Sequence, residues 1–318
     1  SPTEVMERYM YPVLVDMAMT AKLNAPVERP IHLFGAGHPN IFAMSVAMGY
    51  DLFDSAAYAL FAKDERYLTN RGTYLFKDLQ YLPCGCPICR NRSPEDLRDM
   101  PQHERQRLIA EHNLHVTMAE METVKQAIVE GSLWDLVETR AKGHAEMTSA
   151  LKNLSKYSKY LEEGSSGFKG KGVFYYDYHS LAKPEVIRYQ RKLMENYRKP
   201  ANKDIRILLT TPNRKPYSRN QGFKKLKKQL KEYGDRVEFC FIAAPYGLIP
   251  ENLAETYPTS QYQIAQPLDY ETIQHTVGNI IEYLEKHPAK TIIAYKDTPL
   301  DQELIKQLDG KYSAVLIN

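Results

Sequence analysis

IHLFGAG, residues 31–37, is a short apolar run that ends in a glycine turn, and DLFD, residues 51–54, is a second run of strand length. Hydrophobic periodicity predicts a helix over residues 4–23 before the first run and another over residues 39–48 between the two. Helix, strand, helix, strand in this order is typical of a parallel α/β barrel or a doubly wound sheet. In such folds the chemistry lies at the carboxyl ends of the strands, where the glycine turn and Asp54 fall.

These two strand ends carry the first candidate site residues. Gly35 and Gly37 allow the backbone to approach a ligand closely. However, Asn40 stands where the G-x-G-x-x-G fingerprint has its third glycine, so a dinucleotide-binding Rossmann domain is disfavoured. Asp54 lies between Phe53 and small residues, a setting that suits a partly desolvated nucleophile or base. The alternative is an aspartate that caps a helix or a turn.

CGCPIC, residues 84–89, followed by His112, forms the second candidate site. Three of the four cysteines of the chain lie in these six residues, too close together to pair sensibly as disulfides. The thiols of Cys84, Cys86 and Cys89 with one imidazole are a ligand set typical of structural Zn²⁺. His103 and His115 are also nearby, and His112 and His115 share one face if residues 104–120 are helical. The fourth cysteine, Cys240, stands in an apolar run and is expected in a core.

Composition limits the remaining possibilities. The chain has 318 residues, 43% of them hydrophobic, which favours two domains over one. It contains no run of 18 apolar residues, so we expect no membrane span, and its first residues do not resemble a signal peptide. Free thiols without an export signal indicate a cytoplasmic protein. The formal net charge is only +3, but lysines crowd residues 224–231 and 152–171, which is compatible with nucleic-acid binding or with a solvated face.

The composition shifts near Gly164, where a lysine-rich connector begins. We expect residues 164–203 to form a linker and a connecting helix, the helix over residues 184–197. Beyond them, β-rich runs at residues 204–211, 237–244, 291–296 and 313–318 alternate with helical stretches at 221–233, 271–287 and 301–308. This alternation predicts a second α/β domain over residues 204–318.

The ordered motifs HLFGAGHP (32–39), DLFDSAAYAL (51–60) and the cysteine cluster with EHN (111–113) resemble the tRNA-guanine transglycosylase family, most closely its archaeal branch. The resemblance implies exchange of guanine at position 15 of tRNA for 7-cyano-7-deazaguanine (preQ0), on the way to archaeosine. It implies a catalytic (β/α)8 barrel of the TIM type, a zinc ion as cofactor, and tRNA and the preQ0 base as partners. It also favours His112 over His115 as the fourth ligand.

The same resemblance assigns individual roles. Asp54 matches the nucleophile that holds the tRNA ribose covalently, and Phe34, beside Gly35 and Gly37, matches the position that lies against the bound base. Lys63 matches a basic position that contacts tRNA phosphate, and Arg66 is a neighbouring candidate. The target guanine must leave its stack to reach the aspartate.

One departure concerns the barrel. We expect residues 1–163 to supply only the C-terminal part of the family's barrel, with a zinc module at about residues 79–119 as an insertion. The second catalytic aspartate and most base-recognising groups then need another chain or segment that carries the N-terminal part of the barrel. We also expect apolar faces at residues 13–17 and 41–46 to lie open for that segment, and self-association near the zinc module.

Two alternatives remain. KPYS, residues 215–218, is similar to part of the active motif of archaeosine synthase, a paralogue that acts on preQ0-containing tRNA. However, Thr211 and Pro212 stand where that motif has cysteine and serine, and Gly222-Phe223 replace its serine and histidine, so the nucleophile is missing. The other alternative is a non-catalytic tRNA-binding subunit that lends its zinc module to a partner.

Overall fold

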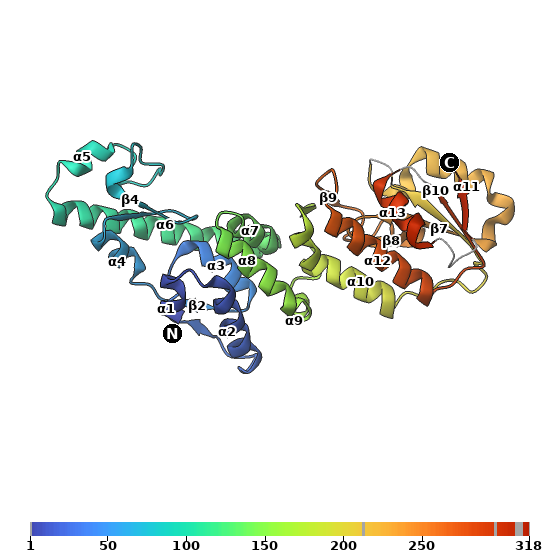
Figure 1. Cartoon of the computed structure of the whole chain (residues 1–318), viewed down its shortest axis with the longest axis horizontal. Coiled ribbons are helices and arrows are strands. Elements are labelled where there is room, and N and C mark those ends of the chain that lie inside the picture. Colours follow the sequence, from blue (N-terminus) through green and yellow to red (C-terminus); the bar gives the residue numbers. More distant parts are fainter. Residues whose placement is uncertain (1, 212–213, 296–297, 309–313, 318) are drawn as a thin grey trace. The chain divides into compact units, whose positions relative to one another are not determined.

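The computed structural model describes residues 2–211, 214–295, 298–308 and 314–317. The chain divides into two compact units, Ser1–Gly164 and Ser165–Asn318 (Figure 1). Each unit has its own hydrophobic core, and each is described by itself. Among the helices in the described ranges, none is both long enough and apolar enough to cross a membrane.

The first unit begins with two helices, α1 (Pro2–Glu7) and α2 (Tyr11–Leu23), where the sequence analysis expected one helix over residues 4–23. That expectation was wrong, because the backbone turns at Tyr9, whose φ is +55°. Pro12 then occupies the first turn of α2, the one part of a helix where a missing N–H has no cost.

The two short runs form a parallel pair, β1 (His32–Leu33) with β2 (Leu52–Phe53). Helix α3 (Pro39–Ala47) connects them, as predicted. Among the described residues this parallel sheet is two-stranded, with α2, α3 and α8 (Ala145–Leu154) supplying most of the adjoining core. It brings the residues after both strands to one edge.

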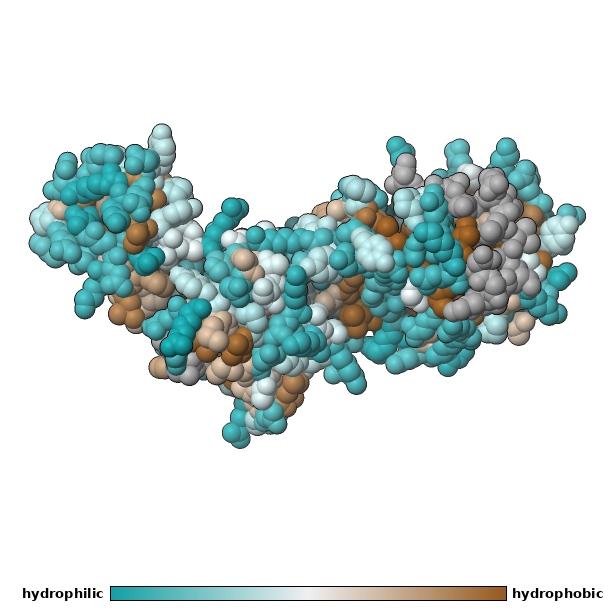
Figure 2. All heavy atoms as spheres, in the orientation of Figure 1, coloured by the Kyte–Doolittle hydropathy of each residue, from teal (hydrophilic) through white to brown (hydrophobic). Residues whose placement is uncertain are grey.

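Of the two apolar faces that were expected to be exposed, residues 13–17 and residues 41–46, only the first is exposed in part. In α2, Val13 and Met17 are 40% and 41% exposed, and Figure 2 shows hydrophobic surface over the N-terminal helices. In α3, by contrast, Ile41 and Met44 are buried, so the expectation for residues 41–46 was wrong. Packing of α3 against α6 and α7 covers its apolar side chains.

The rest of the first unit surrounds the cysteine cluster. Helix α4 (Ala57–Lys63) leads to an antiparallel hairpin of β3 (Arg66–Leu68) and β4 (Thr73–Leu75). The short helix α5 (Pro94–Arg98) precedes α6 (Gln102–Glu130), which is longer than predicted and ends at Gly131 in the left-handed conformation, with φ +70°. Helices α7 (Leu133–Ala141), α8 and α9 (Ser158–Glu163) complete the unit.

The second unit is built on a five-stranded sheet in the order β11-β10-β6-β7-β8. Strands β6 (Ile205–Thr210), β7 (Val237–Ala243), β10 (Thr291–Tyr295) and β11 (Ala314–Ile317) are parallel and correspond to the four predicted runs. Strand β8 (Gly247–Pro250), antiparallel to β7, was not predicted, because it is short and ends in proline. Cys240 in β7 is fully buried, which confirms it as a core residue.

Helices α11 (Gln221–Gln229), α12 (Tyr270–Lys286) and α13 (Pro299–Leu308) match the predicted helical stretches of this unit. The connecting helix predicted over residues 184–197 is confirmed, and residues 164–203 also contribute side chains to the core of this unit. Strand β5 (Val173–Tyr175) pairs with β9 (Tyr262–Ile264), and α10 (Pro184–Glu195) buries Val186, Tyr189 and Leu193. The 3.6-residue spacing of these apolar side chains accounts for that packing.

Candidate active site and metal centre

Asp54 follows β2, at the edge where the parallel pair β1–β2 ends. Its Oδ1 accepts a hydrogen bond from the backbone N–H of Gly35 at 2.9 Å and lies 3.1 Å from Nε2 of His32. Register explains the contact, because His32 pairs with Leu52 and places the turn after β1 beside the residue after β2. The Asp54 side chain is 41% exposed, so solvent or a ligand can reach it.

The glycine turn has a defined steric role. Gly35 has φ +73°, a left-handed conformation that glycine adopts without strain. At Gly37 a Cβ atom would lie 1.9 Å from Oγ of Ser55, so the two strand ends could not approach as they do. Ser55 Oγ also donates a hydrogen bond to the Gly37 carbonyl at 3.3 Å. The turn therefore fixes the distance between β1 and the loop that carries Asp54.

A pocket of about 700 Å³ opens at this edge. Asp54, Phe34, Gly35 and Gly37 line it, together with Arg66 from the β3–β4 hairpin. Its other walls come from the N-terminal helices and from groups that the sequence analysis did not single out: Tyr9, Tyr11, Arg71 and His144. The structure thus gathers three carboxylates (Glu7, Asp54 and Asp64), aromatic rings and two guanidinium groups around one cavity.

The predicted nucleotide contacts occupy different positions. The ring of Phe34 is perpendicular to that of His32, with the ring centres 6.0 Å apart, and because Phe34 is 65% exposed its ring is accessible for stacking on a base. Arg66 Nη1 donates to Oγ1 of Thr73 at 3.1 Å and lines the pocket. Lys63 is exposed at the end of α4 but does not line the pocket. Arg71 does, at the tip of the hairpin; the Arg71-Gly72 pair, a basic residue beside a turn glycine, is the only local signal that could have identified it.

His38 lines the same pocket but is not suited to acid–base chemistry. Burial lowers the pKa of His38 to about 4, so its imidazole is neutral near pH 7. Its Nδ1 accepts a hydrogen bond from the backbone N–H of Asn40 at 3.2 Å, which caps the start of α3. His38 therefore supports the helix that connects β1 to β2.

The cysteine cluster brings four donor atoms together. The Sγ atoms of Cys84, Cys86 and Cys89 and one nitrogen of His112 all lie within 4.8 Å of one another. Cys86 Sγ is 3.5 Å from Cys89 Sγ, and His112 Nδ1 is 3.5 Å and 3.4 Å from these two atoms. A tetrahedral zinc ion with Zn–S bonds of about 2.3 Å requires ligand atoms roughly 3.7 Å apart. The cluster fits such an ion closely.

The surroundings of His112 select the nitrogen that faces the thiols. Its Nε2 lies 2.9 Å from the Leu68 carbonyl, to which it donates when protonated, leaving Nδ1 unprotonated as a ligand. The ring stacks on Tyr67 at 3.7 Å, and the Tyr67 hydroxyl is 3.3 Å from Cys89 Sγ. His103 and His115 are outside the four-residue set among the described residues. His112 is thus the imidazole that the fold presents.

Burial raises the pKa of two of these thiols, Cys84 and Cys89. The pKa of the Cys89 thiol rises to about 12, so without a metal the thiolate is unfavourable at neutral pH. A divalent ion reverses that preference, because it binds the deprotonated thiol. The donor set, its spacing and the histidine partner all fit Zn²⁺.

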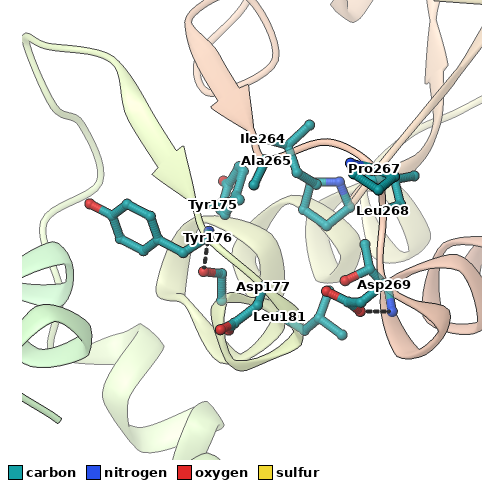
Figure 3. A pocket seen from close by; sticks show the side chains of 12 residues that line it. Tyr175, Tyr176, Asp177, Leu181, Ile264, Ala265, Pro267, Leu268 and Asp269 are labelled. Atoms are coloured by element: carbon teal, nitrogen blue, oxygen red, sulfur yellow. Dashed lines mark hydrogen bonds between the residues drawn. The ribbon is translucent and has the colours of Figure 1, made fainter. Parts of the chain in front are cut away.

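One pocket of the second unit is small. This pocket beside β5 and β9, lined by Tyr175, Asp177 and Asp269, holds only about 20 Å³, room for a single water (Figure 3). Lys215 lies near Tyr217 and 4.0 Å from the ring centre of Tyr262, and burial lowers the pKa of its ammonium group. Pro212, one of the positions compared with the synthase motif, lies outside the described residues.

Two family matches divide the chain much as the structure does. Residues 2–146 match the family described as queuine tRNA-ribosyltransferase. Residues 186–315 match a domain family of unknown function.

Curated relatives match nearly the whole chain. A tRNA-guanine(15) transglycosylase of Methanobrevibacter smithii is 41% identical over 97% of this chain and 46% of its own length. The proteins of that name from Saccharolobus solfataricus and Methanocaldococcus jannaschii are 39% and 38% identical, covering 90% and 89% of this chain. These alignments span 57% and 42% of the two relatives, so the chain spans about half the length of the relatives it matches.

A solved structure of a protein of unknown function is 19% identical, covering 41% of this chain and 42% of that one, with a TM-score of 0.31. A score this low supports no argument about fold.

Proposed function

Because residues 2–146 form a domain of the queuine tRNA-ribosyltransferase family, we propose that this chain takes part in guanine exchange in tRNA, with Asp54 as the nucleophile. The observation that carries the proposal is the position of Asp54. It lies half-exposed at the end of a parallel strand, hydrogen-bonded by its neighbouring strand and open to a pocket of about 700 Å³. The alternative role as a helix cap is disfavoured, because its side chain faces Gly35 and His32 instead.

The proposed reaction proceeds in two displacements. A carboxylate oxygen of Asp54 forms a bond to ribose C1′ while the C1′–N9 bond breaks, and guanine leaves with the electron pair and takes up a proton from a general acid. The incoming base then loses its N9 proton and bonds to C1′, and the carboxylate departs. The tRNA backbone stays intact throughout, since only the glycosidic bond is exchanged.

The pocket suits an extruded nucleotide. The exposed ring of Phe34 offers a stacking surface for the base, and the guanidinium groups of Arg66 and Arg71 offer charge to the flanking phosphates. Lys63, outside the pocket, adds charge along the backbone of the RNA. These contacts position the tRNA, and they do not distinguish one sequence from another.

The substrates follow from the relatives. Proteins named tRNA-guanine(15) transglycosylase match this chain over nine-tenths of its length or close to it. We infer guanine at position 15 of tRNA as the leaving base and preQ0 as the incoming base, within archaeosine biosynthesis. A general acid and the groups that recognise the base are then supplied by a segment that completes the barrel around β1 and β2.

Zinc has a structural role in this proposal. Bound by Cys84, Cys86, Cys89 and His112, it would cross-link the loop that carries the thiols to the middle of α6. The histidine ligand also contacts the carbonyl of Leu68 at the end of β3. The metal would therefore hold the hairpin that presents Arg66 and Arg71 to the pocket.

The test is Asp54→Asn in the enzyme with its barrel complete. We expect radiolabelled guanine exchange and the covalent tRNA adduct to be lost, while tRNA binding remains. Asp78→Asn, which changes an exposed carboxylate that does not line this pocket, is the matched control for charge. Normal exchange by Asp54→Asn would overturn the assignment and favour a tRNA-binding subunit without catalytic function.

A further inference from the structure

The two oxygens of the Asp54 carboxylate have different surroundings. Oδ1 accepts the Gly35 N–H at 2.9 Å and lies 3.1 Å from His32 Nε2. Within the part of the chain that the structure describes, Oδ2 has no hydrogen-bond donor. Oδ1 is therefore held by two neighbouring groups, whereas Oδ2 is available to a ligand in the pocket.

We propose that His32 is a positioning residue that holds Oδ1 and so selects Oδ2 as the atom that bonds to ribose. This inference rests on the proposed role of Asp54 as the nucleophile. Hydrogen bonds draw negative charge onto Oδ1 and restrict rotation of the carboxylate. The oxygen without donors keeps its lone pairs available, and its direction is set by the two contacts on its neighbour.

The arrangement serves both displacements. When Oδ2 bonds to C1′ and the C1′–N9 pair leaves with guanine, Oδ1 becomes the carbonyl oxygen of the ester and can keep both donors. When the incoming base attacks C1′, the pair of the Oδ2–C1′ bond returns to Oδ2 and restores the carboxylate. The same two hydrogen bonds then stabilise the departing group, so His32 need not move between the steps.

The two donors come from β1 and from the glycine turn that follows it. His32 lies in β1, whose backbone pairs with β2, and its ring is perpendicular to the ring of Phe34, with the ring centres 6.0 Å apart. Gly35 directs its N–H at the same oxygen through its left-handed backbone, with φ +73°. For the contact to be a hydrogen bond, the proton of a neutral His32 must be on Nε2. That tautomer is an observable consequence of the proposal.

The first test needs no activity. In the full chain labelled with ¹⁵N-histidine, we expect the NMR shifts of His32 to report a proton on Nε2, and Asp54→Ala to shift this signal. His103, exposed on α6, is the internal reference, since its signal should not respond. A His32 signal that is the same in both proteins would overturn the contact and with it the proposal.

The second test compares His32→Leu with His32→Gln, whose amide can still donate to Oδ1. In the enzyme with its barrel complete, we expect His32→Leu to slow formation of the covalent adduct about ten- to a hundredfold, the effect of one hydrogen bond to a charged group. KM for tRNA should change less than about twofold, and His32→Gln should recover most of the rate. His103→Leu is the control.

The outcomes separate the two proposals. If the wild-type enzyme forms the adduct and His32→Leu forms it at the same rate, the role of His32 is overturned and Asp54 remains the proposed nucleophile. Equal losses in both variants with a raised KM would indicate that His32 only supports the fold, which also overturns the proposal. No exchange and no adduct in the wild-type enzyme would instead overturn the proposed function, while the NMR experiment still reports whether the contact exists.

Discussion

The metal centre and the Asp54 pocket lie in the same unit but are built in different ways. The candidate metal ligands come from one six-residue segment and one helix, and Cys89 and His112 are only 5% and 1% exposed. The pocket takes its residues from N-terminal helices, two strand ends, a hairpin and the start of α8, and the proposed nucleophile Asp54 is 41% exposed. The first site is closed and local, whereas the second is open and depends on the positions of many elements.

One residue connects the two regions. Asn113, next to the ligand His112, is fully buried, and its Oδ1 accepts the Leu68 N–H at 2.8 Å. Its Nδ2 donates to the carbonyls of Tyr58 and Arg66 at 3.0 Å and 3.1 Å. Helix α6 is thereby fastened to α4 and to the hairpin that lines the pocket. Stability of the closed site is thus expected to affect the geometry of the open one.

The largest expected effect is loss of a metal ligand. Cys86→Ser should lower zinc from about one ion per chain to less than half, because small metal sites depend on the complete ligand set. Elemental analysis and hydrogen exchange over residues 79–119 measure the metal content and the local unfolding. Cys240→Ser is the control, since it alters a buried thiol in the other unit and should leave the zinc content unchanged. Full zinc occupancy in Cys86→Ser would contradict the ligand assignment.

Asn113→Ala tests the connection between the two regions. It leaves one backbone N–H and two carbonyls without their partner, so we expect the free energy of unfolding to fall by about 2–4 kcal/mol. Denaturant unfolding followed in the isolated chain measures this change. Gln106→Ala, which removes a single exposed bond to the Lys63 carbonyl, should cost less than about 1 kcal/mol. Equal effects of the two variants would show that Asn113 does not fasten the hairpin.

Gly37→Ala tests the open site at the strand ends. The new Cβ atom would clash with Ser55, and we expect a loss of about 1–3 kcal/mol from overpacking. Adduct formation should also fall, because Ser55 adjoins Asp54. In Gly37→Ala/Ser55→Gly the clash is removed, so stability should recover in part. No recovery in the double variant would place the strain elsewhere.

The smallest effect is expected at Lys63. Because this side chain is exposed outside the pocket, Lys63→Ala should weaken tRNA binding only a few-fold. The slope of the logarithm of the binding constant against the logarithm of the salt concentration should become smaller by about one. Arg71→Ala, inside the pocket, should weaken binding more and also slow adduct formation. Lys125→Ala on α6 is the control, since that lysine is paired with Glu122. An unchanged salt dependence in Lys63→Ala would exclude a phosphate contact.

Features that depend on local spacing could be predicted from the order of residues alone. Three thiols in six residues must lie near one another, so a metal site could be predicted without long-range contacts. The alternation of helices with strands in both units likewise follows from periodicity, as does the parallel pairing of β1 with β2. Asp54 could be placed at a strand end because the apolar run stops there.

Which side chains meet depends on long-range packing and could not be predicted. His112 and His115 lie on one helix, and the choice between them depends on Leu68 and Tyr67, which belong to a different element. The contact of His32 with Asp54 depends on the register of two strands, and Arg71 reaches the pocket only because a hairpin folds toward it. Periodicity gives the type of each element, but the direction of a side chain toward another element is set by packing, which no local pattern contains.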